Sequence, residues 1–247
     1  MKRIFDVFVA GFGLIISSPV LLPAIFLVWW QDKRSPFYVA DRVGKNERLF
    51  RMVKLRSMVV GADKNKVDST SVYDKRITPI GRTIRRFKLD ELTQLWNVLL
   101  GSMSMVGPRP NVKRETDLYT PLEAQLLNVK PGITDFASIV FSDEAEILKD
   151  AFDPDLAYNQ LIRPGKSLLG IFYIHHQSFW VDIQLCCFTA VAILKRSWAL
   201  GGIKRLLESL SAPPELLAIA SRKAPLEPRP PPGSDHVVTS RSEKGVL

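Results

Sequence analysis

A long apolar stretch at the N-terminus constrains this chain more than any other feature of its sequence. Between Ile4 and Trp30 the stretch contains one acidic residue, Asp6, and no basic residue. A cleaved secretory signal is disfavoured, because the stretch is long and ends in Trp29 and Trp30 instead of the small residues of a cleavage site. The sequence therefore predicts that the N-terminal segment lies in a membrane.

Ser18 and Pro19 lie near the middle of this stretch, and Pro23 follows them. Proline lacks an amide hydrogen and clashes with the preceding helical turn, so we expect the helix to break at Ser18-Pro19. Each arm would then be too short to cross a bilayer at about 1.5 Å per residue. This favours a re-entrant hairpin, with residues 2–3 and 33–34 on the same cytoplasmic side. A straight membrane span is the alternative.

Asp6 is a charged residue inside an apolar arm. A carboxylate is costly there unless it has a partner. Arg3 or a polar group of the soluble part of the chain could be that partner.

Charge and rare residues exclude several classes of protein. The 247-residue chain has a formal net charge of +9, which suits nucleic acid, an anionic lipid surface or a phosphorylated substrate. No zinc-finger, helix-turn-helix or RNP signature accompanies the charge, so nucleic acid is not expected. The two cysteines are adjacent, at Cys186 and Cys187, which argues against a disulfide framework. The three histidines lack the HExxH spacing of a zinc site.

The strongest chemical signal is the pair Asp90 and Glu91. It lies between a basic run at residues 82–88 and an apolar helical register that begins at Leu92. A carboxylate among cations at the start of a helix can stay ionised beside a phosphate-bearing substrate. Arg109, held between two prolines, adds a further fixed cation. The pattern indicates chemistry on a phosphate; the plainer alternative is that Asp90 only caps a helix.

The rest of the sequence predicts a mostly α-helical protein with small β elements. Short strands are expected between residues 35 and 54, an interrupted helix over 77–100, and a short acidic helix over 143–150. The polar segment 61–74 is expected to be a mobile loop. Residues 179–196 predict either a helix that lies flat in the headgroup layer or a core helix.

A series of short motifs runs through the chain in a fixed order. They are Lys2-Arg3-Ile4-Phe5-Asp6, Ser18-Pro19, Arg42-Val43-Gly44, Phe50–Met58, Ile77–Arg82, Leu89–Leu99, Gly101–Pro110 and Lys130–Thr134. Taken together, they resemble the bacterial sugar transferase family, whose small monotopic members are polyprenyl-phosphate phosphoglycosyl transferases. Each motif alone is weak, but their joint order and spacing are specific.

The resemblance implies transfer of a phospho-sugar from a nucleoside diphosphate sugar, usually a UDP-sugar, to undecaprenyl phosphate, with release of UMP. This would be the first membrane step in assembling an exopolysaccharide, capsule, O-antigen or glycoprotein glycan. The resemblance also implies Mg²⁺ and a re-entrant hairpin broken at Ser18-Pro19. Inner-membrane lipids and downstream glycosyltransferases are further expected partners. The chain looks like the minimal form of the family.

Three parts are therefore expected along the chain. Residues 1–34 would form the re-entrant membrane hairpin, and residues 35–211 a compact catalytic domain on the cytoplasmic face of the bacterial inner membrane. Seven of the 17 prolines fall between Pro213 and Pro232. Because little apolar surface is available there, residues 212–247 are expected to be largely disordered, apart from a short helix near 215–220.

The resemblance also implies roles for five residues. Asp90 is expected to be a nucleophile that forms a covalent phospho-sugar aspartate. Glu91 is expected to orient the site, to help bind the metal or to assist proton transfer, and both carboxylates are candidate Mg²⁺ ligands. Lys54, Arg85 and Arg109 match basic positions of the family and are expected to bind phosphates. The plainer alternative for these three is solvated surface charge.

The chain departs from the family pattern in three places. Residues 135–143 replace a Gly-Trp-Ala-Gln-Val-Asn-Gly-Arg-like run, Ala40 stands where glutamine is common, and Thr93 where proline is common. The altered segment can lie near the donor, so these departures affect the expected sugar or nucleotide preference more than the class of activity.

Two other functions stay open on the sequence. A membrane-anchored phosphohydrolase would also use an aspartyl nucleophile, but it would hydrolyse the donor without a lipid acceptor. A non-catalytic scaffold of a glycan-assembly complex would not need Asp90, Glu91 and Arg109.

Overall fold

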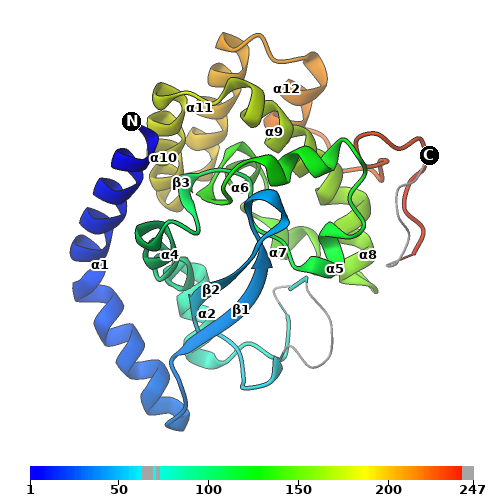
Figure 1. The fold of residues 1–247 in the computed structure, drawn as a ribbon. Helices are drawn as coiled ribbons and strands as arrows, with labels where there is room; N and C mark the ends of the chain where they lie inside the picture. The colour runs from blue at the N-terminus through cyan, green and yellow to red at the C-terminus, as the bar shows by residue number, and fades with distance from the viewer. Residues whose placement is uncertain (63–68, 71–72, 241–247) are drawn as a thin grey trace.

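The computed structural model describes residues 1–62, 69–70 and 73–240 (Figure 1). Within them the chain is mostly helical with two small sheets, as expected. The predicted loop at 61–74 lies mostly outside the described residues. The helices are α1 (Lys2–Asp32), α2 (Pro79–Arg86), α3 (Leu89–Leu92), α4 (Gln94–Leu100), α5 (Lys113–Thr116), α6 (Phe136–Val140), α7 (Glu144–Ile147), α8 (Pro154–Ala157), α9 (Arg163–His176), α10 (Phe179–Leu194), α11 (Arg196–Ser209) and α12 (Pro214–Ser221), with shorter turns η1 (Lys45–Glu47), η3 (Glu123–Asn128) and η4 (Tyr158–Ile162). The strands are β1 (Phe37–Val43), β2 (Leu49–Leu55), β3 (Ser104–Val106) and β4 (Gly132–Thr134).

The two sheets bring together motifs that are distant in the sequence. β1 pairs antiparallel with β2, and β3 pairs in parallel with β4. The chain after β3 passes so close to β4 that a Cβ atom on Gly132 would lie 2.1 Å from the backbone nitrogen of Gly107. Since no side chain fits between these backbones, both motifs require glycine at this crossing.

Ser18 and Pro19 lie inside a continuous α1, so the predicted interruption there is not confirmed. Residues 2–32 form one continuous helix that contains both prolines of the stretch. Pro19 cannot donate to the carbonyl of Ile15, four residues earlier. Ser18 Oγ donates to that carbonyl instead, at 2.7 Å. Figure 1 shows a helix that bends along its length, with its two ends far apart at one edge of the molecule, so the expected hairpin is not confirmed.

Polar contacts hold the N-terminal half of α1 against the rest of the protein. Asp6 is 3% exposed, and its Oδ1 accepts hydrogen bonds from Ser104 Oγ at 3.0 Å and from the Met105 amide at 2.9 Å. The expectation that Asp6 needs a partner is confirmed, and the partner is β3. Arg3 instead donates to two carbonyls in the last turn of α4, at 2.5 and 2.7 Å, where a cation is favourable.

Arg56 holds the other end of α1. Its Nη1 and Nη2 donate to the two carboxylate oxygens of Asp32, at 2.7 and 2.6 Å, and its Nε donates to the carbonyl of Ser35 at 2.8 Å. A two-pronged arginine–carboxylate contact fixes orientation as well as distance. Because Arg56 directly follows β2, this contact ties the end of α1 to the strand that carries Lys54.

One face of α1 is apolar and exposed. Large apolar side chains recur on it every three or four residues, with one gap of seven between Ile15 and Leu22, at Ile4, Phe8, Phe12, Ile15, Leu22, Phe26 and Trp30. Among the described helices, α1 alone is long and apolar enough to cross a membrane. Its 31 residues span about 46 Å at about 1.5 Å per residue. This exposed apolar face makes α1 a membrane anchor.

The main core lies where the sheet of β3 and β4 meets helices α6, α9, α10 and α11. Fully buried side chains from these elements include Phe136, Leu169, Tyr173, Leu185 and Ile203. In Figure 1 these helices form the upper part of the molecule, and the β1–β2 hairpin lies below them. The core thus forms one side of the region between the β1–β2 hairpin and these helices.

α10 is a core helix along one side, which is one of the two alternatives that the sequence left open for residues 179–196; the headgroup-layer alternative stays a prediction. It buries Val181, Asp182 and Leu185 in the core. Trp180 and Leu194, in contrast, are largely exposed. The helix packs in the core along one side and presents apolar side chains outward along another.

The C-terminal segment is ordered by contacts with the domain. The short helix expected near 215–220 is present as α12. Beyond it, Thr120 Oγ1 donates to the carbonyl of Pro232 at 2.5 Å, and Gln160 Nε2 donates to the carbonyl of Val238 at 2.7 Å. A proline-rich chain still offers carbonyl acceptors, so the described residues of this tail make specific contacts, and the expectation of a largely disordered tail is not confirmed for them. The division into three domains stays a prediction.

Replacing Asp6 with alanine should lower the stability of the protein. The buried Met105 amide would lose its acceptor, which costs on the order of 1–3 kcal/mol. We therefore expect the Tm to fall by about 2–12 °C, measured by thermal unfolding of the purified protein in detergent. Ile4→Ala, on the exposed face of α1, is the control and should leave the Tm nearly unchanged. Equal Tm values for wild type and Asp6→Ala would contradict the assignment.

Candidate active site

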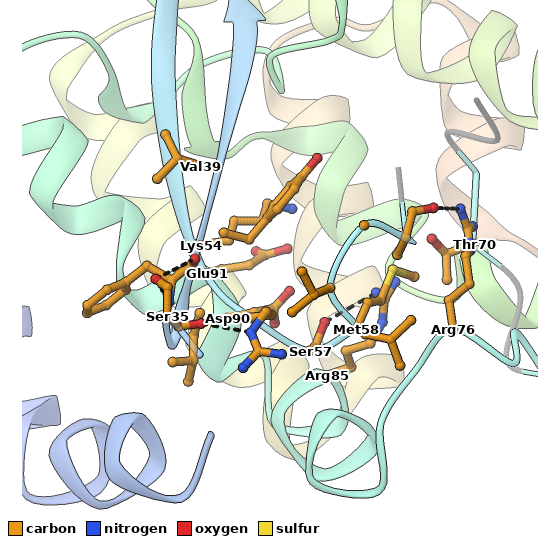
Figure 2. Close-up of a pocket in the computed structure, with 18 of the residues that line it drawn as sticks. Ser35, Val39, Lys54, Ser57, Met58, Thr70, Arg76, Arg85, Asp90 and Glu91 are labelled. Carbon is orange, nitrogen blue, oxygen red and sulfur yellow. Dashed lines mark hydrogen bonds between the residues drawn. The ribbon is translucent and has the colours of Figure 1, made fainter. Parts of the chain in front are cut away.

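Four segments bring the five predicted residues to one cavity of about 540 Å³, called here the large cavity. Lys54 comes from β2, Arg85 from α2, Asp90 and Glu91 from α3, and Arg109 from the loop after β3. Figure 2 shows Lys54, Asp90 and Glu91 close together, with Arg85 on a neighbouring wall. The structure thus gathers groups that the sequence places up to 55 residues apart.

A turn at Lys88 presents Asp90 and Glu91 to this cavity. Lys88 has a φ of 53°, in the left-handed region, and separates α2 from α3, close to the expected interruption of the helix. Thr93 Oγ1 then donates to the carbonyls of Val53, at 3.1 Å, and Asp90, at 3.2 Å, which anchors α3 to β2. Lys88 stands at the N-cap of α3, and no side chain caps this helix. Capping therefore does not account for Asp90.

Glu91 is held in a strong ion pair with Arg109. Arg109 Nη2 lies 2.5 Å from Glu91 Oε1. Burial by itself would raise the pKa of Glu91, but Arg109, followed by Lys88 and Lys54, outweighs burial and lowers this pKa to about 2. Glu91 in turn raises the pKa of Arg109 above its ordinary value. Glu91 is therefore ionised and fixed in place, as suits a residue that orients its neighbours.

Asp90 is in a different state from its neighbour. Its carboxylate forms no hydrogen bond or ion pair with any other described residue. Burial raises the pKa of Asp90 and the charge of Glu91 raises it further, while Lys54 and Arg85 oppose them; the net shift is upward. Its lone pairs remain available to a substrate or a metal ion, which is what a nucleophile or a ligand requires.

Lys54 is a cation that the protein has partly desolvated. Burial lowers the pKa of Lys54, repulsion from Arg109 and Arg42 adds to this effect, and Asp90 and Glu91 oppose it; the resulting pKa is about 8. Lys54 is therefore charged at neutral pH and loses its charge as the pH rises past 8. A poorly hydrated ammonium group in a cavity suits a phosphate.

Sequence reasoning missed some residues of the large cavity. Arg42 and Arg114 also line it. Arg42 stands in the motif Arg42-Val43-Gly44, which was the available signal, whereas Arg114 reaches the site only through folding. Ser18 and Pro19 lie within α1 and line neither this cavity nor the next one described.

A second cavity, of about 310 Å³ and called here the small cavity, meets the large one at the reactive groups. Lys54, Asp90, Glu91 and Arg109 line both. Polar side chains form much of its remaining wall, namely Ser138, Ser142, Glu144, Tyr158 and Lys166. Two of them belong to segment 135–143, so the segment that departs from the family pattern lies next to Asp90.

The carboxylates fit Mg²⁺ together with a substrate. The described residues contain no group of three or more His, Cys, Asp or Glu side chains that could hold a metal ion. Mg²⁺ is commonly held by one or two carboxylates plus substrate phosphates. Asp90, whose carboxylate has no partner among the described residues, and Glu91 meet this requirement.

Comparison with known proteins agrees with the motifs and the arrangement of the site. The family model described as bacterial sugar transferase matches residues 1–196. The chain belongs to the bacterial sugar transferase family. The resemblance of the motifs is thereby confirmed, and the match extends from α1 through α10.

Named relatives include enzymes that act on sugar phosphates. The chain is 30% identical over 197 residues to the UDP-N-acetylgalactosamine-undecaprenyl-phosphate N-acetylgalactosaminephosphotransferase of Aeromonas hydrophila, covering 78% of this chain and 44% of the relative. It is 36% identical over 196 residues to the undecaprenyl-phosphate glucose phosphotransferase of Komagataeibacter xylinus, covering 76% and 35%. It is 34% identical over 174 residues to the exopolysaccharide production protein ExoY of Rhizobium meliloti, covering 64% and 77%. The chain thus spans less than half of the length of the first two.

The two carboxylates should affect stability in opposite directions. The raised pKa of Asp90 means that its ionised form is disfavoured in the folded state, so Asp90→Asn should keep or raise the Tm at pH 7. The lowered pKa of Glu91 contributes stability above pH 4.5 that is lost as the pH falls towards 2. Glu91→Gln should remove this contribution, on the order of 2 kcal/mol, and lower the Tm by about 4–8 °C.

Thermal unfolding of both variants in the same detergent tests this contrast. A fall in Tm for Asp90→Asn as large as that for Glu91→Gln would show that both carboxylates have a structural role.

Proposed function

We propose that this chain transfers a sugar-1-phosphate from a nucleoside diphosphate sugar, with UDP as the nucleotide, to undecaprenyl phosphate, and releases UMP. The observation that carries the proposal is the carboxylate of Asp90, which forms no hydrogen bond or ion pair with another described residue although Lys54, Arg85 and Arg109 line the same cavity. Relatives named for undecaprenyl phosphate and for UDP-N-acetylgalactosamine support these substrate classes. The membrane anchor beside the cavity supports a lipid acceptor.

The first step uses Asp90 as the nucleophile. A carboxylate oxygen attacks the phosphorus that bears the sugar, the bond from this phosphorus to the bridging oxygen breaks, and its electron pair leaves with UMP. Lys54, Arg85 and Arg109 bind the phosphate oxygens on which negative charge collects. Glu91 holds Arg109 in position for this contact.

The second step returns Asp90 to its original state. A phosphate oxygen of undecaprenyl phosphate attacks the same phosphorus, and the bond between the phosphorus and Asp90 breaks. The carboxylate is regenerated, and the product carries the sugar on a lipid diphosphate. The covalent phospho-sugar aspartate thus divides one difficult transfer into two displacements.

Mg²⁺ is part of this proposal. When bound, it would neutralise charge on the leaving nucleotide, with Asp90 and Glu91 as the carboxylates that hold it together with the substrate pyrophosphate.

The membrane position follows from the acceptor. The phosphate of a prenyl phosphate lies at headgroup height while its chain stays in lipid, so the reactive carboxylate must lie near that plane. We place the catalytic domain on the cytoplasmic face of the bacterial inner membrane, where nucleotide sugars are made. The product would pass to glycosyltransferases that extend an exopolysaccharide or a related glycan.

An assay of UMP release tests the proposal. The purified protein is incubated with a panel of UDP-sugars and Mg²⁺, with or without undecaprenyl phosphate. Without acceptor we expect a burst of one UMP per enzyme, because the covalent adduct cannot turn over; with acceptor, release should continue. Mass spectrometry should locate the adduct on Asp90, and Asp90→Asn should lower the rate by at least about 10³-fold.

The two alternative functions, a phosphohydrolase and a scaffold, each predict a different result. Continuous hydrolysis without acceptor would indicate a phosphohydrolase. Full cellular function of Asp90→Asn would indicate a scaffold.

The rate of the UMP burst should depend on pH in a bell shape. Asp90 must be ionised to attack, and its raised pKa places the acidic limb above the ordinary value of 3.8, so the rate falls as the pH drops through that limb. Lys54 must be charged to bind phosphate, and its pKa of about 8 makes the rate fall as the pH rises past 8. Lys54→Arg should shift the alkaline limb to higher pH, because arginine stays protonated.

The burst is measured without acceptor, since the acceptor phosphate itself titrates. If the alkaline limb of the pH profile is unchanged in Lys54→Arg, a group other than Lys54 causes that limb.

A further inference from the structure

The two cavities that meet at Asp90 have different walls. The large cavity begins at Arg34 and Ser35, directly after α1, and includes the apolar side chains of Phe37 and Val39 (Figure 2). The small cavity is lined by hydroxyl groups and by charged groups of both signs. The difference in wall chemistry indicates different occupants.

The proposed double displacement assigns these occupants. Attacking and leaving oxygens lie roughly in line across a phosphorus that is being transferred. UMP therefore leaves from the side opposite Asp90, and the acceptor phosphate must later attack from that same side. The sugar is a third substituent on the phosphorus and stays in place through both steps. One cavity must therefore serve the nucleotide and the acceptor in turn, and the other must hold the sugar.

The position of the anchor decides between the two cavities. A lipid phosphate arrives beside α1, and the large cavity adjoins the end of that helix through Arg34 and Ser35. Arg56, which lines the same cavity, contacts Asp32 at the end of α1. The large cavity therefore suits the nucleotide and the acceptor, and the small cavity is left for the sugar.

Tyr158 is an independent sign that the small cavity takes a ligand. Its side chain is 8% exposed and lines the cavity, yet its hydroxyl forms no hydrogen bond with any other described residue. Burial raises the pKa of Tyr158 well above its ordinary value, so the hydroxyl stays protonated. This hydroxyl lines the cavity without a partner among the described residues, and a hydroxyl of a bound ligand would supply one.

Glu144 and Lys166 present complementary groups in the same wall. Lys166 Nζ on α9 pairs with Glu144 Oε2 on α7. Carboxylates accept hydrogen bonds and ammonium groups donate them, whereas neighbouring hydroxyls of a sugar ring can do both. Arg222 Nη2 donates to Asp143, the residue before Glu144, at 3.0 Å, which helps to fix this wall.

We propose that Tyr158, Glu144 and Lys166 form the sugar subsite of this enzyme and bind the hydroxyl groups of a pyranose ring through both steps. The inference rests on the proposed function and adds the residues that select the sugar. A sugar that lacks a hydroxyl at this wall would leave buried polar groups without partners. The subsite should therefore discriminate against deoxy sugars.

Tyr158→Phe and Lys166→Met test the subsite, with Glu146→Gln as the matched control. Glu146 lies on the same short helix as Glu144 but is exposed and pairs with Lys149. Two quantities are measured for each protein: the KM of the UMP burst for a panel of hydroxylated and deoxy UDP-sugars, and the affinity for UMP alone by calorimetry. We expect both subsite variants to raise the KM for the preferred sugar roughly 10-fold. The difference in KM between the hydroxylated and the deoxy UDP-sugars should therefore become smaller. UMP affinity should stay within about 2-fold, because UMP lacks the transferred pyranose that the subsite binds.

The outcomes separate the subsite from the function on which it rests. Retained UMP affinity shows that the variants are folded. A parallel loss of UMP affinity and donor affinity would place the nucleotide in the small cavity and overturn the assignment. Unchanged KM values in both variants of an active protein would overturn it as well. A wild-type protein that releases no UMP from any donor would refute the proposed function itself, and the subsite with it.

Discussion

The contact between Arg56 and Asp32 sets the relation between the membrane and the site. Arg56 lies two residues after Lys54, so the residue that ties α1 to the domain belongs to the same segment as a cation of the large cavity. At the other end of α1, Asp6 is buried against β3 and Lys2 pairs with Asp182 of α10. A helix held at both ends keeps its exposed apolar face at a fixed position relative to the cavity. In the proposed reaction, a lipid-linked phosphate can therefore meet the carboxylates without a change in the position of α1.

The neighbours Asp90 and Glu91 show how one pair of acidic residues acquires two different states. Arg109 engages Glu91 and lowers its pKa, whereas Asp90 is half-buried, its carboxylate has no hydrogen-bond or ion-pair partner among the described residues, and its pKa rises. Pairs of titratable groups whose environments push their pKa values apart are typical of sites in which the two have different tasks. One carboxylate stays fixed, and the other remains available to the substrate.

The C-terminal part of the chain has a structural role at the same site. Arg222, at the end of α12, lies beyond the residues matched by the family model and contacts Asp143 beside the small cavity. The segment after α12 is held by side-chain donors such as Thr120 and Gln160. The wall of the small cavity is thus supported by elements that differ from the shared motifs. Such a wall can change between relatives while the reactive carboxylates stay the same.

The sequence by itself determined the membrane anchor, the mostly helical fold, the family and the five residues of the large cavity, because hydrophobic length and ordered motifs are local properties. Tertiary structure decided the rest. Pro19 predicted a broken helix, but the Ser18 hydroxyl satisfies the carbonyl that proline leaves without a donor. The composition of the tail predicted disorder, but donors from distant segments bind its carbonyls. The different states of Asp90 and Glu91 depend on the 2.5 Å contact between Arg109 and Glu91, which forms only when the chain folds. No local sequence pattern specifies this contact.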